Sequence, residues 1–246
     1  MKIDLFKNIP VFKNILEKDD NNREINIYKT KNVCLTGHSI FYPNTLLKTD
    51  DKLILPILER TMSLKCGTIY EKQNMEYNYT KTEIKEIVNE PLFFFIYNTD
   101  NYFHFLYDTL PYLISFFELK KELPKLKLLM QLPNPQKKEM YRFVLEFLQL
   151  LNIEKKDIVM ANTETEYSNI YISTSYTHDI DSNLPPRKEI FDFYKHFVNI
   201  VNERYSIKTT PKKLYISRRT WLHNDFSNIG TNYTTRRKLV NEDELV

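Results

Sequence analysis

The feature that most constrains the fold is an uninterrupted apolar run at residues 92–97. A strand with one face in water alternates apolar and polar residues, whereas a strand buried on both faces is apolar throughout. The polar residues 98–100 then follow, as expected of a loop at the carboxyl end of such a strand. The run therefore predicts a buried strand of a parallel sheet.

After this run, strand patterns alternate with helix-length patterns. We expect a helix from Asn101 that Pro111 either kinks or divides, because proline lacks the N–H that a helix interior needs. Asn134 with Pro135, and Pro185 with Pro186, are patterns typical of the starts of two further helices. Further strands are expected at 126–132, 157–160, 169–173 and 213–217. Strands separated by helices indicate crossover connections, so the predicted class is α/β with a Rossmann-like parallel sheet.

The first 75 residues have a different pattern, with polar turns between short strands expected at 25–28, 32–35, 39–42 and 53–57. Next, Thr80 and Glu83 form a capping-box pattern before Ile84, Ile87 and Val88 at helical spacing, which predicts a helix over 81–89. We therefore divide the chain into a β-rich region (1–75), a Rossmann-like domain (76–206) and the beginning of a second such domain (207–246).

Composition excludes several function classes. Only 3 glycines occur in 246 residues, too far apart to form a dinucleotide fingerprint or a phosphate-binding P-loop. The 35 Lys and Arg nearly balance the 32 Asp and Glu, so no nucleic-acid-binding field is expected. Two cysteines, Cys34 and Cys66, cannot form a four-thiolate zinc site.

No signal peptide is visible at the first residues, and no apolar run approaches the ~20 residues of a membrane span. We therefore expect a cytoplasmic protein without a membrane span.

The strongest candidate for chemistry is the segment after the buried run. His104 and Asp108 are four residues apart, so they share one helical face at the carboxyl edge of the sheet. A carboxylate can hold an imidazole in one tautomer and raise its basicity, as a general base requires. Asn101 can cap the helix or offer its amide to a substrate. The alternative is a structural histidine packed between Phe103 and Phe105.

A second candidate is the strand at 213–217, which ends directly in Arg218 and Arg219. Guanidinium groups there can grip a diphosphate in bidentate fashion. Arg236 and Arg237 stand before an acidic helix-start pattern. The alternative for both groups is a solvated basic loop.

These segments together resemble glycosyltransferase family 61. Residues 101–111, N-Y-F-H-F-L-Y-D-T-L-P, follow its pattern N-[aromatic]-x-H-x-x-x-[D/E]-x-x-P. Residues 213–219, K-L-Y-I-S-R-R, resemble its strand ending in Ser-Arg, and residues 237–245 resemble its R-x-[apolar]-x-N-E-x-E-L helix start.

The resemblance implies a GT-B architecture of two Rossmann-like domains, and inverting, metal-independent transfer from a nucleotide sugar to a glycan or glycoprotein, as in polysaccharide biosynthesis. By position it implies catalytic roles for His104 and Asp108, and substrate contacts for Asn101. In the same way it implies donor-phosphate contacts for Arg218 and Arg237, and further substrate contacts for Asn241 and Glu242.

The sequence departs from the family at two places. Residues 221–235 look like an insertion, and the sequence stops at Val246, where family members continue into a donor-binding half. We expect a fragment, a split gene product or a degenerate member.

Two alternatives remain open. A catalytically inactive glycan- or protein-binding domain would explain the missing half. Asp179 and Asp181 form a D-x-D pattern that holds a divalent cation in other transferases, but short acidic patterns are ordinary in loops. No metal or cofactor is therefore expected.

Overall fold

The computed structural model describes residues 3–36, 46–49, 52–56, 83–97, 99, 101–132, 139–179, 182–183 and 185–205. The chain divides into two compact units, Met1–Arg204 and Tyr205–Val246. All elements below belong to the first unit, apart from the last residue of the final helix. The predicted boundaries after residues 75 and 206 remain predictions.

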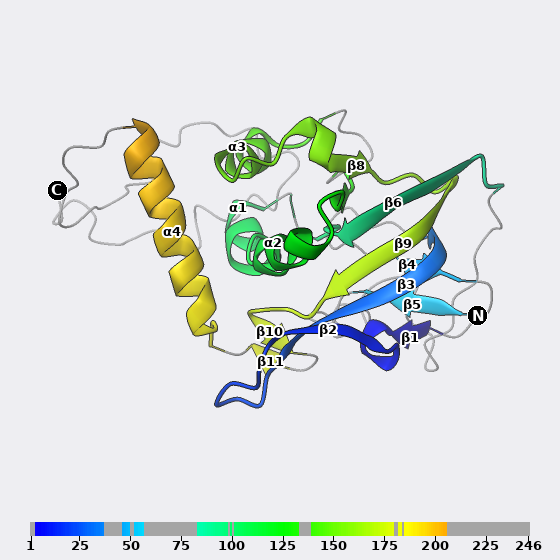
Figure 1. Ribbon diagram of the computed structural model, residues 1–246, viewed down its shortest axis with the longest axis horizontal. Coiled ribbons are helices and arrows are strands. Elements are labelled where there is room, and N and C mark those ends of the chain that lie inside the picture. Colours follow the sequence, from blue (N-terminus) through cyan, green and yellow to red (C-terminus); the bar gives the residue numbers. More distant parts are fainter. Residues whose placement is uncertain are drawn as a thin grey trace, which may run out of the picture. The chain divides into compact units, whose positions relative to one another are not determined.

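The described part of the chain forms an α/β fold around a nine-stranded mixed sheet (Figure 1). Its strands follow the order β1-β5-β4-β3-β9-β6-β7-β8, and β2 pairs with β3 beside this path. A separate short pair is formed by β10 (His178–Asp179) and β11 (Ser182–Asn183). The strands of the large sheet are β1 (Ile3–Leu5), β2 (Val11–Leu16), β3 (Ile25–Thr36), β4 (Leu46–Lys48), β5 (Leu53–Leu55), β6 (Glu86–Phe94), β7 (Lys127–Met130), β8 (Ile158–Met160) and β9 (Thr165–Ser173).

Four neighbouring strands, β9, β6, β7 and β8, pair parallel in that order, and β1 also pairs parallel with β5. The predicted strands at 126–132, 157–160 and 169–173 are confirmed as β7, β8 and β9. On the other side, β3 is antiparallel to β2, β4 and β9. The described strands of the first 75 residues, β1 to β5, therefore belong to the same sheet as β6 to β9.

In this region the structure joins the strands predicted at 25–28 and 32–35 into the single strand β3. Asn32 has a φ of 51°, a left-handed conformation that asparagine tolerates, so β3 continues through it. The strand predicted at 53–57 is β5, and the strand predicted at 39–42 lies outside the described residues.

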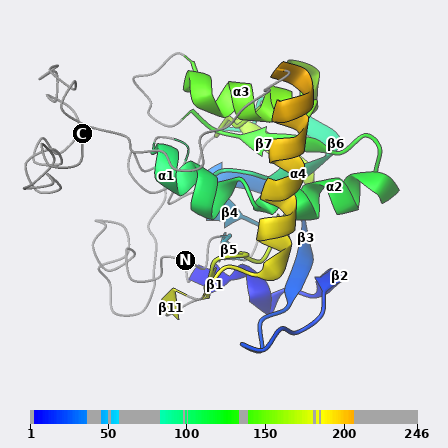
Figure 2. The ribbon, with the colours of Figure 1, turned by 90° about the vertical axis from the view of Figure 1, so that its left-hand side faces the viewer.

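The helices are α1 (Tyr102–His104), α2 (Tyr112–Glu122), α3 (Arg142–Leu150) and α4 (Lys188–Tyr205), with a π-helical turn, η3 (Phe105–Thr109), between α1 and α2. The predicted helix start at Asn101 is confirmed, and Pro111 begins the second segment, α2. Figures 1 and 2 show α4 beyond α2 and α3, on the side away from the long strands. The helix with Phe143 begins at Arg142, and the cap predicted at Asn134 lies outside the described residues.

The helix predicted over 81–89 is wrong, because residues 86–90 begin the strand β6. Glu86 and Val88 pair in register with Thr165 and Tyr167 of β9. The β-branched residues that suggested a helix face are also the best strand formers, and pairing with β9 decides between the two. Pro91 lies where the register shifts, a place in a strand that tolerates proline.

The run at 92–97 is buried as predicted, but only its first three residues belong to the strand, because β6 ends at Phe94. It packs against α2: the Phe93 and Phe116 rings meet edge to face at 5.7 Å, and Tyr97 stacks on Tyr112 at 3.9 Å. One part of the main core therefore lies between the end of β6 and α2.

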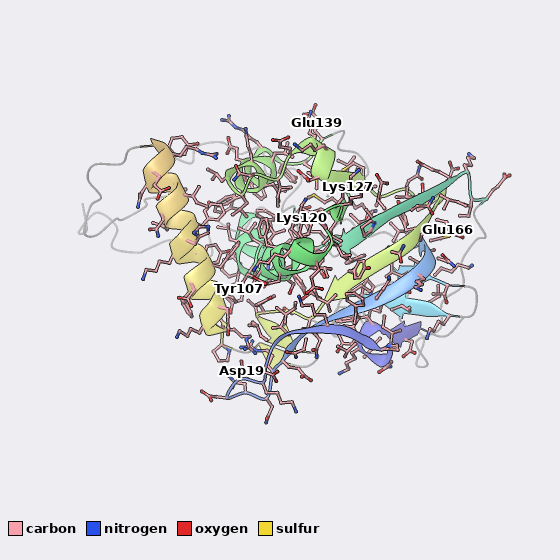
Figure 3. All side chains as sticks on the ribbon, in the orientation of Figure 1. Asp19, Tyr107, Lys120, Lys127, Glu139 and Glu166 are labelled. Carbon is pink, nitrogen blue, oxygen red and sulfur yellow. The ribbon has the colours of Figure 1, made fainter. Side chains whose placement is uncertain are left out.

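Two buried arginines connect the loop between β2 and β3 to the start of α4. Arg23 donates to both Asp19 and the carbonyl oxygen of Pro185, each at 2.9 Å. Arg187 donates to the carbonyl oxygens of Arg23 and Glu17. Figure 3 shows Asp19 in that loop. These bonds fix the first turn of α4 to the N-terminal strands.

Acid should destabilise this fold, and Asp157 should carry part of the effect. Burial raises the pKa of Asp157, but hydrogen bonds from the Lys120 ammonium, at 2.8 Å, and from the Glu154 N–H lower it by more, so the net pKa lies below its ordinary value. A carboxyl group with a lowered folded-state pKa stabilises the fold above its unfolded-state pKa of about 4 and loses this contribution as the pH falls further.

We expect the urea midpoint of the wild-type protein to fall between pH 5 and about pH 3, and that of Asp157→Asn to fall less. The control is Glu118→Gln, which removes an exposed carboxylate paired with Lys121 on the same helix as Lys120. A wild-type pH dependence in Asp157→Asn would contradict the assignment.

Candidate functional site

The candidate site begins where the chain leaves the buried part of β6. Asn101 caps α1, since its Oδ1 accepts hydrogen bonds from the N–H groups of Phe103 (3.0 Å) and His104 (3.2 Å). Asparagine is among the preferred residues at such a position. The cap fixes the first turn of α1 and with it the backbone of His104.

His104 and Asp108 form the direct contact expected from their spacing. The distance from His104 Nδ1 to Asp108 Oδ2 is 2.6 Å. The side chain of His104 is 35% exposed, whereas that of Asp108 is 11% exposed. When the acceptor is an ionised carboxylate, Nδ1 is the donor and a neutral ring has its lone pair on Nε2. The contact therefore pairs a partly exposed imidazole with a buried carboxylate.

The π-helical turn η3 holds Asp108 in place below His104. The Leu110 N–H donates to the Phe105 carbonyl at 2.7 Å, the i to i+5 bond of a π-helix. Such single turns occur often at functional sites. The hydroxyl of Tyr194, on α4, donates to the carbonyl of Leu106, and Phe105 packs against Phe143 of α3 at 5.5 Å. Helices α3 and α4 thus buttress the turn that carries the pair.

Aromatic side chains border the pair on the solvent side. Phe103 is 63% exposed and Tyr102 54% exposed. The ring of Phe103 lies parallel to that of Tyr107, with centroids 5.6 Å apart, and meets the His104 ring edge to face at 5.4 Å. Tyr107 is labelled in Figure 3. An exposed aromatic surface therefore adjoins the imidazole.

A cavity of about 770 Å³ lies at the carboxyl ends of β7 and β8, and sequence reasoning missed it. Leu145 of α3 lines it, while Phe143 and Phe147 on another face of α3 contact Tyr102, so α3 separates the cavity from the histidine. Its lining includes Met130, Gln131, Leu132, Glu139, Met140, Lys155, Met160 and Thr163; Glu139 is labelled in Figure 3. These residues come from separate segments, and no local pattern marks them.

The described part of the structure does not place the other predicted site residues near the His104–Asp108 pair. Arg218, Arg237, Asn241 and Glu242 lie outside the described residues, as does the strand predicted at 213–217. Asp179 lies in β10, and Asp181 lies outside the described residues. Their roles remain predictions.

Within the described ranges, no helix is long and apolar enough to cross a membrane. In the same ranges, no three His, Cys, Asp or Glu side chains gather as metal ligands would. Comparison of the chain with protein-family models, with curated proteins and with solved structures finds no match.

Proposed function

We propose that this chain forms the acceptor-side part of an inverting GT-B glycosyltransferase, which transfers a sugar from a nucleotide sugar to a glycan or glycoprotein. The observation that carries the proposal is the 2.6 Å contact between His104 and Asp108 at the end of a buried parallel strand. Ligands of open α/β sheets bind at this edge. The similarity of residues 101–111 to the family 61 pattern gives this pair its proposed chemistry.

In the proposed reaction His104 is the general base. Its Nε2 takes the proton of an acceptor hydroxyl, whose oxygen attacks the anomeric carbon of the donor. The bond from that carbon to the diphosphate oxygen breaks, and the diphosphate leaves with the electron pair. Asp108 fixes the tautomer and stabilises the imidazolium that forms.

The leaving diphosphate needs positive charge, and we assign this role to Arg218 and Arg237. A guanidinium can donate two parallel hydrogen bonds to a phosphate. Asn241 and Glu242 are assigned to the donor sugar, and Asn101 to the acceptor side, where its side chain also caps α1. No step of this mechanism uses a metal ion.

The test is release of nucleoside diphosphate from a panel of nucleotide sugars, with and without a mixture of glycan acceptors. We expect release that requires an acceptor and is the same in His196→Ala, a control that removes an exposed histidine of α4.

Donor turnover without acceptor dependence would contradict the proposal. An absence of turnover with every donor, together with glycan binding, would favour the second candidate, a catalytically inactive glycan-binding domain. The exposed aromatic surface beside His104 is the observation that favours that candidate.

A further inference from the structure

We propose that the ring of Phe103, supported by the ring of Tyr107, is a stacking surface for a carbohydrate ring, which holds the acceptor sugar beside His104. This inference rests on the proposed function for the role of the bound sugar as acceptor. The binding itself can be measured without any transfer reaction.

The first argument is the geometry of the two rings. They are stacked, 11° from parallel with centroids 5.6 Å apart, so Tyr107 supports the Phe103 ring from one side. Single exposed apolar residues are ordinary on protein surfaces, but Phe103, at 63% exposure, is held by its contacts with Tyr107 and His104. Its exposed ring, itself six-membered, is large enough to cover the face of a pyranose.

The second argument is chemical complementarity. The face of an aromatic ring carries negative charge density. One face of a pyranose presents axial C–H groups, which are apolar and slightly positive at hydrogen, while its hydroxyls point outward around the ring. A sugar lying on Phe103 would bury its C–H face and keep its hydroxyls available for hydrogen bonds.

The third argument is position along the helix. Phe103 directly precedes His104, and the two rings meet edge to face with centroids 5.4 Å apart. A sugar stacked on Phe103 would therefore lie beside the imidazole.

The experiment is saturation-transfer NMR with the methyl β-glycosides of glucose, galactose and xylose, without nucleotide sugar. We expect transfer mainly to the C–H protons on one face of at least one glycoside. Phe103→Leu should weaken its binding by about 5- to 10-fold, whereas Phe103→Trp should retain it. Phe191→Leu is the matched control, because Phe191 on α4 is also 63% exposed.

Equal binding in Phe103→Leu and the wild-type protein would overturn the inference, as would a lack of binding by all three glycosides. An equal loss in Phe191→Leu would indicate adsorption to any exposed ring and would also overturn it. The enzyme proposal fails separately: glycoside binding that depends on Phe103, with no transfer in any donor assay, would leave the stacking surface intact and remove only the catalytic role.

Discussion

Replacing Arg187 with methionine should lower the free energy of unfolding by about 3–5 kcal/mol, a large fraction of the 5–15 kcal/mol typical of a domain. The side chain is 5% exposed, and it donates to the backbone carbonyls of Arg23 and Glu17 and to the carboxylate of Glu189. Methionine fills a similar volume but donates nothing. The carbonyls and the carboxylate would then lose their donor while remaining partly shielded from water.

The change is measured by urea unfolding followed by circular dichroism. Arg142→Met is the matched control, because Arg142 also pairs with a carboxylate, that of Glu146, but its side chain is 90% exposed. This control should cost less than about 1 kcal/mol. Arg187→Lys should lie between the two, since an ammonium cannot span the same acceptors. Similar midpoints for Arg187→Met and Arg142→Met would contradict the structural role of the buried arginine.

Removing the imidazole in His104→Ala should lower turnover by about 10²–10⁴, the range typical of a lost general base. The melting temperature should change little, because the side chain is 35% exposed and its contacts with Asp108 and Phe103 lie within the same helical segment. Asp108→Asn should cost less than His104→Ala, since an amide oxygen can still accept from Nδ1 but carries no charge to stabilise the imidazolium.

Turnover is measured as acceptor-dependent release of nucleoside diphosphate, per molecule shown to be folded by circular dichroism. His196→Ala, on the exposed face of α4, is the control and should keep wild-type turnover. If His104→Ala instead melts much earlier and retains normal turnover per folded molecule, the histidine is structural, and the base assignment is wrong.

The sequence predicted the parallel half of the fold because its signals are local. The buried run at 92–97 is apolar at every position, so its burial on both faces did not depend on knowing its neighbours. The prediction of a helix over 81–89 was wrong for the opposite reason. Ile87 and Val88 fit both the helical and the strand period, and only pairing with the distant β9 selects the strand. Residues 29–31 were similarly predicted as a break between two strands but lie within β3.

The distinction between local and long-range signals also applies to the candidate site. The contact of His104 with Asp108 follows from spacing within one helix, and so does the cap by Asn101. By contrast, the bond from the Tyr194 hydroxyl to the Leu106 carbonyl joins segments far apart in the sequence. The cavity at the ends of β7 and β8 also depends on long-range packing, which no local pattern encodes.

The central position of β9 has a consequence for synthesis on the ribosome. This strand pairs with β3 on one side and β6 on the other, and residue 27 of β3 aligns with residue 173 of β9. Until that late residue has emerged, β3 and β6 each present an open edge, and open edges readily pair with other chains. The nascent chain therefore has two incomplete parts of the sheet, each with an exposed edge. Its tendency to aggregate through these edges ends only when β9 pairs with both β3 and β6.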